Sequence, residues 1–573
     1  MLKLFRDLIC PTQALAVSLV FWVTPAVHAQ FPPLDTEPQR IPDPPLDPPE
    51  LPSEPPPELD IPEPPTTPEF TPIERSVYVS EFRFLGNTVF SDAELTAIAE
   101  PYTNRNVSFA ELLELRSQIT NLYVERGYTT SGAFIPIEEN QNLDVDAASI
   151  AIQILEGQVE ELQVLGDSRL ETYVRARVER AISPVLNQPG LEEALRLLQS
   201  DPLIQSISAN LSAGSQPNLS ALTVQVSGQP PFALQAGIDN SRSPSIGTLQ
   251  VDSQLQAANL LSLGEIFSAE YTHTDGSDQI DLEFSLPVNL DNGTIAVRYS
   301  NLDTQIVEAP FDQFDIDIDS RIYELTYRQP ILRRADSSQL EELTLGITAS
   351  RLESESTIEG FPFPLSAGAD EEGRTRVSEL SLFQEYRRQM NRSALLARSE
   401  FSVGLDLLGA TVNESGPDGR YLLWRGQLAW LQALGTSQLL VRGEAQLSTD
   451  SLVPLNQFSL GGTDTIRGYR QGALVTDNGV LGIVELRVPL LGQEENTRLD
   501  LIPFFAAGVG WNHDSDSAID NNVLVAPGLG LQFEAGDFQA RLNYAVPLTD
   551  VSFEGDSFQE EGFDFRLQYR TRF

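Results

Sequence analysis

The chain ends with the stretch FDFRLQYRTRF, residues 563–573, in which apolar or small and polar side chains alternate without a break. Successive side chains of a β-strand point to opposite faces, so this stretch predicts a strand between an apolar and a wet environment. A transmembrane β-barrel offers such a strand lipid on one side and a watery lumen on the other. We expect the aromatic last residue, Phe573, to serve barrel assembly, with the assembly machinery as a transient partner and outer-membrane lipid as a lasting one.

The same strand-rich pattern reaches back to residue 229. The turn pair Asn292-Gly293 follows one alternating segment, as is typical of hairpins. Divided at about 21 or 22 residues per strand and connection, residues 229–573 predict an antiparallel transmembrane β-barrel of about 16 strands. A soluble β-sandwich or propeller remains the alternative. Strand candidates are 282–290, 321–327, 343–349, 377–383, 399–405, 438–447 and 531–544.

Before the barrel, one α+β unit occurs twice. Residues 74–157 predict the order β-α-α-β-β, and residues 158–228 repeat it. The repeat supports the prediction of this α+β unit more strongly than either copy would alone. Capping boxes mark the expected helix starts, because serine followed by glutamate three residues later satisfies free backbone N–H groups. They lie at Ser91-x-x-Glu94, Ser108-x-x-Glu111 and Ser168-x-x-Glu171.

The N-terminal region predicts export. Residues 1–29 combine a positive start, a short apolar run and Val27-His28-Ala29, which indicates a cleaved signal peptide. Residues 30–73 form a proline-rich, acidic linker. Proline at this density favours an extended, semi-rigid spacer.

Composition excludes several classes of function. The formal net charge of −45 argues against nucleic-acid binding. One cysteine and three histidines, none clustered, give no metal site of plausible spacing. We therefore expect no enzyme activity, no metal and no cofactor. The run at 315–320, DIDIDS, resembles the start of a calcium loop, but its alternation favours a strand with an acidic luminal face.

The stretch FSLGGTDTIRGYR, residues 458–470, is a glycine-containing segment within the strand-rich region. The paired glycines Gly461-Gly462 permit tight turns, and Arg467 is presented before a third glycine. Arginine in a confined place normally meets a carboxylate. On the residues alone, a surface hairpin is the default interpretation.

With Gly461-Gly462 before it, the motif Ile466-Arg467-Gly468-Tyr469 resembles the [VI]-R-G-[YF] motif of outer-membrane polypeptide translocators. In that superfamily it lies on a loop folded back into the barrel. Residues 82–89 and 123–129 are similar to the first polypeptide-transport-associated (POTRA) domain of two-partner secretion transporters of the hemolysin-activator type. The resemblance covers residues 74–573 and implies two periplasmic POTRA domains, at 74–157 and 158–228, followed by a barrel in the outer membrane.

The chain departs from this family at two points. The loop arginine is expected to pair with an aspartate in an F-x-D-x-G pattern, but the matching stretch, Phe504 to Gly508, has Ala506 in that place. Glu485 on the following strand is the alternative partner. The proline-rich linker also cannot form the plug helix that the family often carries.

The resemblance implies export of a large secreted polypeptide, rich in β-structure, that POTRA domains receive unfolded: type V, or two-partner, secretion through a porin-like channel. A factor that assembles and inserts other barrels is the first alternative, although such proteins usually carry more POTRA units. A solute porin is the second, although porins lack periplasmic repeats.

Overall fold

The computed structural model describes residues 59–60, 76–136, 148–494, 497–513, 522–550 and 557–573. The predicted signal peptide and nearly all of the linker lie outside these residues. None of the helices that the structure describes is long and apolar enough to cross a membrane.

The first unit packs two helices against a small sheet. Its elements are β2 Ser76–Leu85, α1 Asp92–Ala99, β3 Arg105–Ser108, α2 Phe109–Glu125, β4 Gly132–Phe134 and β5 Ala148–Leu155, with sheet order β3-β2-β5-β4. Fully buried Leu95, Leu115 and Ile152 lie in its core. Strand β3 was not anticipated from the sequence. Strand β4 has three residues and follows a turn at residues 128–131, which is closed by Ser131 N–H donating to the Tyr128 carbonyl at 3.0 Å.

Two predicted capping boxes form in this unit. Ser91 caps α1 and Ser108 caps α2, and in each case the glutamate three residues later bonds back to the serine backbone. These reciprocal bonds satisfy N–H groups that a helix start leaves free. Gly127, at φ 88°, follows the end of α2 in the left-handed region, where glycine costs little.

The second unit repeats the arrangement with β6 Gln158–Gly166, α3 Glu171–Ile182, α4 Gln188–Gln199, β7 Ile204–Ala213 and β8 Leu219–Gly228. The capping box predicted at Ser168 is wrong. Helix α3 begins at Glu171 without a side-chain cap, because Asp167 takes the local bonding instead and accepts from Arg169 N–H at 3.0 Å. The short strand β1, Leu59–Asp60, pairs with β7, so the sheet order is β1-β7-β8-β6.

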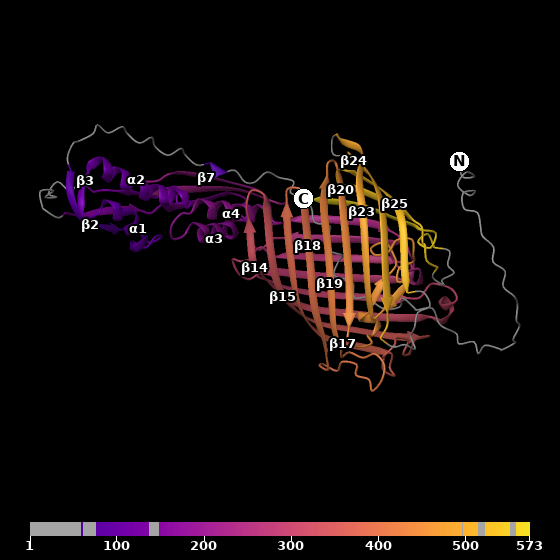
Figure 1. The fold of residues 1–573 in the computed structure, drawn as a ribbon. Coiled ribbons are helices and arrows are strands. Elements are labelled where there is room, and N and C mark those ends of the chain that lie inside the picture. Colours follow the sequence, from indigo (N-terminus) through magenta and orange to yellow (C-terminus); the bar gives the residue numbers. More distant parts are fainter. Residues whose placement is uncertain (1–58, 61–75, 137–147, 495–496, 514–521, 551–556) are drawn as a thin grey trace, which may run out of the picture. The chain divides into compact units, whose positions relative to one another are not determined.

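Sixteen long strands of the described chain form a closed antiparallel barrel, which confirms the predicted fold (Figure 1). Each strand pairs with its neighbour in sequence, and β27 closes the ring against β9. The two-residue β16, Phe361–Pro362, extends the edge of β15. The strands are β9 Phe232–Asp239, β10 Gln250–Ala258, β11 Ile266–Thr274, β12 Ser277–Pro287, β13 Thr294–Gln305, β14 Ile316–Ala335, β15 Gln339–Ile358, β17 Arg374–Met390, β18 Ser393–Leu405, β19 Leu422–Leu434, β20 Ser437–Ser448, β23 Asn478–Glu494, β24 Thr497–Trp511, β25 Val523–Ala535, β26 Phe538–Ala545 and β27 Phe563–Arg572.

Two strand predictions need correction. The candidate at 531–544 is a hairpin, β25 and β26, that turns at Gly536, whose φ is 57°. The candidate at 282–290 ends early, because β12 stops at Pro287. A loop then turns through Asn292, which takes a left-handed φ of 58°.

The predicted acidic luminal face at 315–320 is also wrong. Strand β14 places Ile316, Ile318 and Ser320 on its buried face, whereas Asp319 is exposed on the opposite face together with Tyr323. On the same face of β14, Ile322 packs in one cluster with Val453 and Leu455 from a loop that folds inward, so this face of the strand is apolar and buried.

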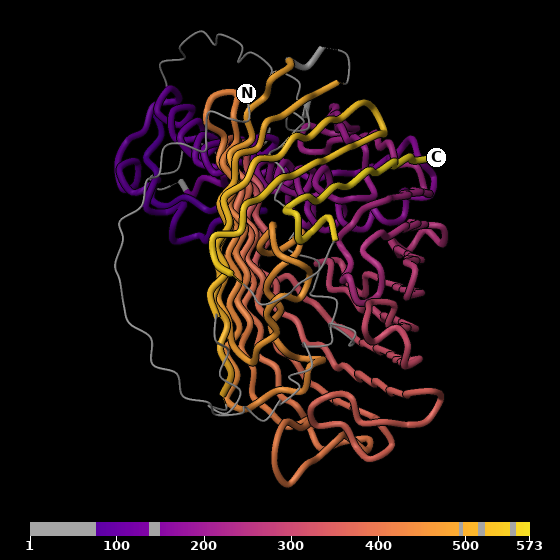
Figure 2. Tube along the Cα trace, turned by 90° about the vertical axis from the view of Figure 1, so that its right-hand side faces the viewer, coloured from indigo at the N-terminus to yellow at the C-terminus, as the bar shows by residue number. Residues whose placement is uncertain are grey.

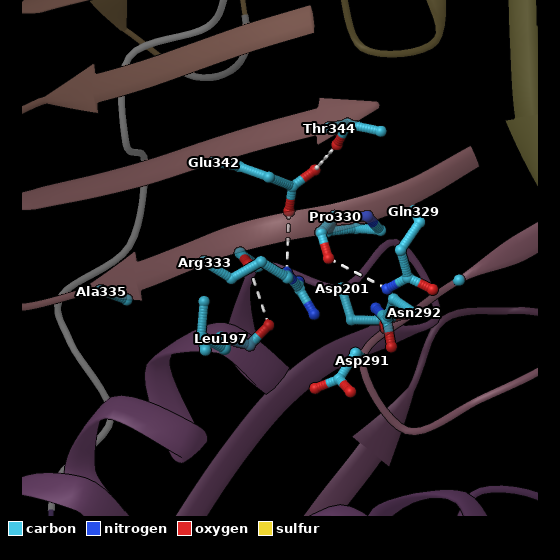
Figure 3. A network of polar contacts seen from close by, with 12 residues as sticks. Leu197, Asp201, Asp291, Asn292, Gln329, Pro330, Arg333, Ala335, Glu342 and Thr344 are labelled. Atoms are coloured by element: carbon cyan, nitrogen blue, oxygen red, sulfur yellow. Dashed lines mark hydrogen bonds and ion pairs between the residues drawn. The ribbon is translucent and has the colours of Figure 1, made fainter. Parts of the chain in front are cut away.

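The second unit contacts the barrel through side chains at short turns. The Arg177 guanidinium lies 3.5 Å from the centre of the Tyr173 ring and donates to Asn292 Oδ1 at 2.7 and 3.1 Å. Nearby, Arg333 on β14 is held by Glu342 at 2.8 Å, beside the turn that carries Asn292 (Figure 3). These contacts join α3 to the turn between β12 and β13.

Candidate functional site

The long connection between β20 and β23, residues 449–477, folds into the barrel. It contains β21, Phe458–Leu460, and β22, Leu474–Thr476, which pair with each other and not with the wall. The motif at 466–469 lies between these two short strands. Figure 2 shows this orange segment running inside the wall of strands. The surface hairpin expected from the residues alone is therefore not formed.

Apolar packing holds the loop against one sector of the wall. Ile466 is fully buried, and Tyr469 is 5% exposed. Burying such side chains contributes about 1.5–3 kcal/mol each. The cluster joins loop residues to strands β23–β26, and its members are Phe458, Leu460, Ile466, Tyr469, Ala473, Leu474, Leu481, Ile483, Phe504, Ala506, Leu524, Ala526 and Ala545.

Glycine allows the loop and the wall to approach closely. A Cβ on Gly508 of β24 would stand 2.7 Å from Ile466 Cδ1 and 3.1 Å from Leu460 Cδ2. Gly468, at φ 92°, faces Ala545 of β26 at a distance that leaves no room for a side chain. Both glycines therefore have a steric reason that the sequence alone did not give.

A buried ion pair lies next to this packing. Arg467 donates through Nη2 to Glu485 Oε1, and the two side chains are 5% and 1% exposed. Arg467 Nε also donates to the Thr463 carbonyl at 3.1 Å, and its guanidinium lies 4.5 Å from the Phe504 ring centre. Arg541 of β26 donates to the same Glu485 oxygen at 3.1 Å. One carboxylate thus joins the loop to two strands of the wall.

The register explains how Glu485 can pair with Arg467 in place of the aspartate that the family resemblance implies. Ala506 faces the interior on β24 and pairs with Ile483 of β23, while Glu485 pairs with Phe504. The carboxylate therefore lies on the neighbouring strand, two residues along from the alanine. A glutamate side chain is one methylene longer than aspartate and reaches Arg467 from there.

The rest of the motif bonds to the wall and to neighbouring loops. The Tyr469 hydroxyl donates to the Val525 carbonyl at 2.9 Å and lies 2.7 Å from Thr549 Oγ1. Arg470 pairs with Glu308 at 2.7 Å and with Glu560 at 3.4 Å. The loop is thereby tied to two other connections at this end of the barrel.

Sequence reasoning missed Arg541 and Arg470. The alternation around Arg541, with Leu542 and Tyr544 facing outward, could have shown an inward arginine. It could not have shown that this arginine meets Glu485, because β24 and β25 lie between the strands β23 and β26 that carry the two residues.

Sequence reasoning also missed a buried carboxylate in the first unit. Glu156 is 6% exposed and accepts from Thr88 N–H at 2.7 Å, Val89 N–H at 2.8 Å and the Tyr123 hydroxyl at 2.9 Å. Burial opposes ionisation of this group, but these hydrogen bonds, including one from the Thr88 hydroxyl, outweigh it and hold the pKa of Glu156 below its ordinary value. The carboxylate fixes the turn between β2 and α1.

Two family models match this chain. The family described as "Haemolysin secretion/activation protein ShlB/FhaC/HecB" matches residues 218–533, and the ShlB-type POTRA domain matches residues 77–157. The outer membrane transporter CdiB of Dickeya dadantii (strain 3937) is 22% identical over 458 residues, which cover 76% of this chain and 77% of that protein. The heme/hemopexin transporter protein HuxB of Haemophilus influenzae (strain 86-028NP) is 20% identical over 502 residues, 81% and 82% of the two chains.

Solved structures share the fold. CdiB from Escherichia coli superposes with a TM-score of 0.64 at 18% identity and covers 88% of this chain and 93% of that one. BamA from Haemophilus ducreyi lacking POTRA domains 1-3 gives 0.51 at 16% identity, covering 86% and 100%. Since the family match takes in more than half of the chain and the POTRA match precedes it, this protein belongs to the ShlB/FhaC/HecB family of two-partner secretion transporters, with its barrel in the outer membrane and its POTRA domains in the periplasm.

Proposed function

We propose that this transporter receives one secreted polypeptide, large and rich in β-structure, in an unfolded state through its POTRA domains at 74–157 and 158–228. The polypeptide then passes through the barrel and folds outside. Folding beyond the membrane gives the passage its direction, and no step in this scheme is catalytic or needs a cofactor.

The observation that carries this proposal is the inward loop with its Arg467–Glu485 pair. The loop is a separate segment that fills part of the interior and pairs with itself, so it can shift without unzipping the wall. The pair is buried on both sides. A buried ion pair holds only while both partners stay in place. The pair therefore defines a closed position of the loop, and separation of Arg467 from Glu485 releases the loop.

The names of the relatives bear on the type of cargo. CdiB is named an outer membrane transporter and HuxB a heme/hemopexin transporter protein. For this chain we propose a polypeptide cargo, because the POTRA sheets offer strand edges where backbone groups of an extended chain can pair with little demand on sequence.

The test begins by identifying the cargo. Deletion of the whole gene should remove one protein from the culture medium, which mass spectrometry of the medium identifies. A chain that lacks residues 74–228 should then fail to export that protein, while its barrel still shows heat-modifiable migration on a gel. Continued export by this variant would refute the role of the POTRA domains. A general loss of outer-membrane proteins in the deletion strain would instead indicate a barrel-insertion factor.

A further inference from the structure

Strand β7 of the second POTRA domain lacks the features that normally protect the edge of a sheet. Its ten residues, IQSISANLSA, include no charged residue and no proline, although 21% of the chain is charged. Natural edge strands are normally kept short or carry charges or proline, because free backbone N–H and C=O groups recruit other strands. An edge without these defences is suited to accept a strand.

The other edges of the two POTRA sheets differ from β7. In the first domain, β3 has four residues and begins with Arg105, and β4 has three. In the second domain, the opposite edge β6 carries Glu160 and Glu161. Of these four edges, β7 is the one that combines length with the absence of charge.

A segment of the chain itself already lies on this edge. Leu59 pairs with Ala209 and Asp60 with Asn210, in parallel orientation. The segment belongs to the acidic, proline-rich region that precedes the first POTRA domain. The pairing covers two of the ten positions of β7, and parallel pairing is slightly less stable per residue than antiparallel pairing. The contact is therefore suited to be displaced.

We propose that the segment at Leu59–Asp60 is an internal strand that covers the β7 edge at rest and leaves it during transport. Four of the exposed side chains along β7 lie at alternate positions and are short and polar, so they place little steric limit on the strand that lies there; they are Ser206, Ser208, Asn210 and Ser212. The paired segment then protects the periplasmic edge from other chains between transport events. This inference rests on the proposed function, since it assigns the cover a role in export.

A disulfide tests the pairing in the full-length protein. The chain has one cysteine, Cys10, which lies in the predicted signal peptide. The variant Asp60→Cys/Asn210→Cys joins two paired positions, and directly opposed residues of neighbouring strands lie about 5 Å apart, within disulfide range. The matched control, Asp60→Cys/Ser206→Cys, uses another exposed position four residues away, roughly 13 Å along the strand. Mild oxidation should cross-link the first pair and leave the control pair free.

Export of the identified cargo supplies the second readout. The oxidised 60/210 variant should export at least tenfold less than the same variant after reduction, whereas the control pair should export equally in both conditions. Failure of the 60/210 pair to cross-link would overturn the pairing. Full export by the cross-linked protein would overturn its role as a displaceable cover. If every reduced variant and the unmodified chain export nothing, the proposed function fails, while cross-link formation still decides whether the segment lies on β7.

Discussion

Two buried carboxylates hold two regions of this molecule in different ways. Glu156 in the first POTRA domain and Glu485 in the barrel are 6% and 1% exposed. Glu156 is satisfied by N–H and hydroxyl groups of its own domain. Glu485 accepts through one oxygen, Oε1, from two guanidinium groups, one of which, on Arg467, belongs to the inward loop.

The difference supports the proposed transport, in which the turn in the first POTRA domain stays in place and the inward loop moves. Neutral donors fixed by a sheet and a helix make Glu156 part of a permanent turn. A charge pair between a wall and a separate loop is strong while closed, and its partners regain hydration when they separate in a wet lumen. Four substitutions break or sharpen this contrast.

The largest effect is expected from Glu485→Ala. Removing one partner of a buried ion pair costs about 3–5 kcal/mol, because the other charge is left buried and unpaired. The loop should lose its defined closed position, and because the proposed passage starts from and returns to that position, export should fall about tenfold or more. Cargo in the medium and heat-modifiable migration of the barrel measure the two consequences separately.

Adding Ala506→Asp to this variant should restore part of the export, because it returns a carboxylate to the inner face of β24 beside the loop. The matched control is Glu385→Ala, another inward glutamate shared by two arginines, Arg328 at 3.0 Å and Arg398 at 3.8 Å, that does not touch the loop. Equal loss of export in both single variants would show that export depends on luminal carboxylates in general and not on the pair between Glu485 and the loop.

Glu156→Gln should have the next largest effect. It removes the charge that strengthens several hydrogen bonds and should cost the turn about 2 kcal/mol. Amide hydrogen exchange at Thr88 and Val89 in the full-length protein should become about 30-fold faster. The control Glu114→Gln, exposed on α2, should leave both rates unchanged. Unchanged exchange in Glu156→Gln would mean that packing alone holds the turn.

The same carboxylate predicts a dependence on pH. The folded pKa of Glu156 lies below its ordinary value of 4.5. A depressed pKa adds stability that is complete above pH 4.5 and declines as the pH falls through the folded pKa. Protection of Thr88 and Val89, corrected for intrinsic exchange, should therefore decrease as the pH falls below 4.5 in the unmodified chain. Glu156→Gln should lack this component, and equal slopes in both proteins would contradict the assignment.

The smallest effect is expected where the second α+β unit, residues 158–228, meets the barrel. Arg177→Ala removes a cation–π contact and two hydrogen bonds to Asn292 and should cost about 1–2 kcal/mol. Exchange in the turn at 288–293 should rise accordingly. Arg180→Ala is the control, because its pair with Asp291 is more than half exposed and contributes at most about 1 kcal/mol. A larger effect from Arg180 would reverse this ranking.

Much of the fold could be predicted because its signals are local. Alternation identified β27, and serine and glutamate three residues apart identified the starts of α1 and α2. The failures were also local. Asp167 accepts from Arg169 N–H just before α3, where a cap by Ser168 was predicted, and Gly536 divides the strand predicted at 531–544 into two.

The candidate site could be predicted from the sequence only in part. The motif at 466–469 and the alternative partner Glu485 could be named from the sequence with the help of a resemblance, but the geometry could not. Arg541 meets Glu485 only because the barrel brings β26 and β23 within reach of one loop. The orientation of Asp319 depends on what fills the interior beside it, which alternation alone does not reveal.

The sequence by itself determined that residues 229–573 build a two-faced sheet and that residues 74–228 repeat one unit, because periodicity and capping act over a few residues. Tertiary structure alone decided which side of each strand faces the lumen, which carboxylate holds Arg467 and which sheet edge is covered. Those outcomes depend on contacts between residues far apart in sequence, and only closure of the barrel and folding of each sheet bring such residues together.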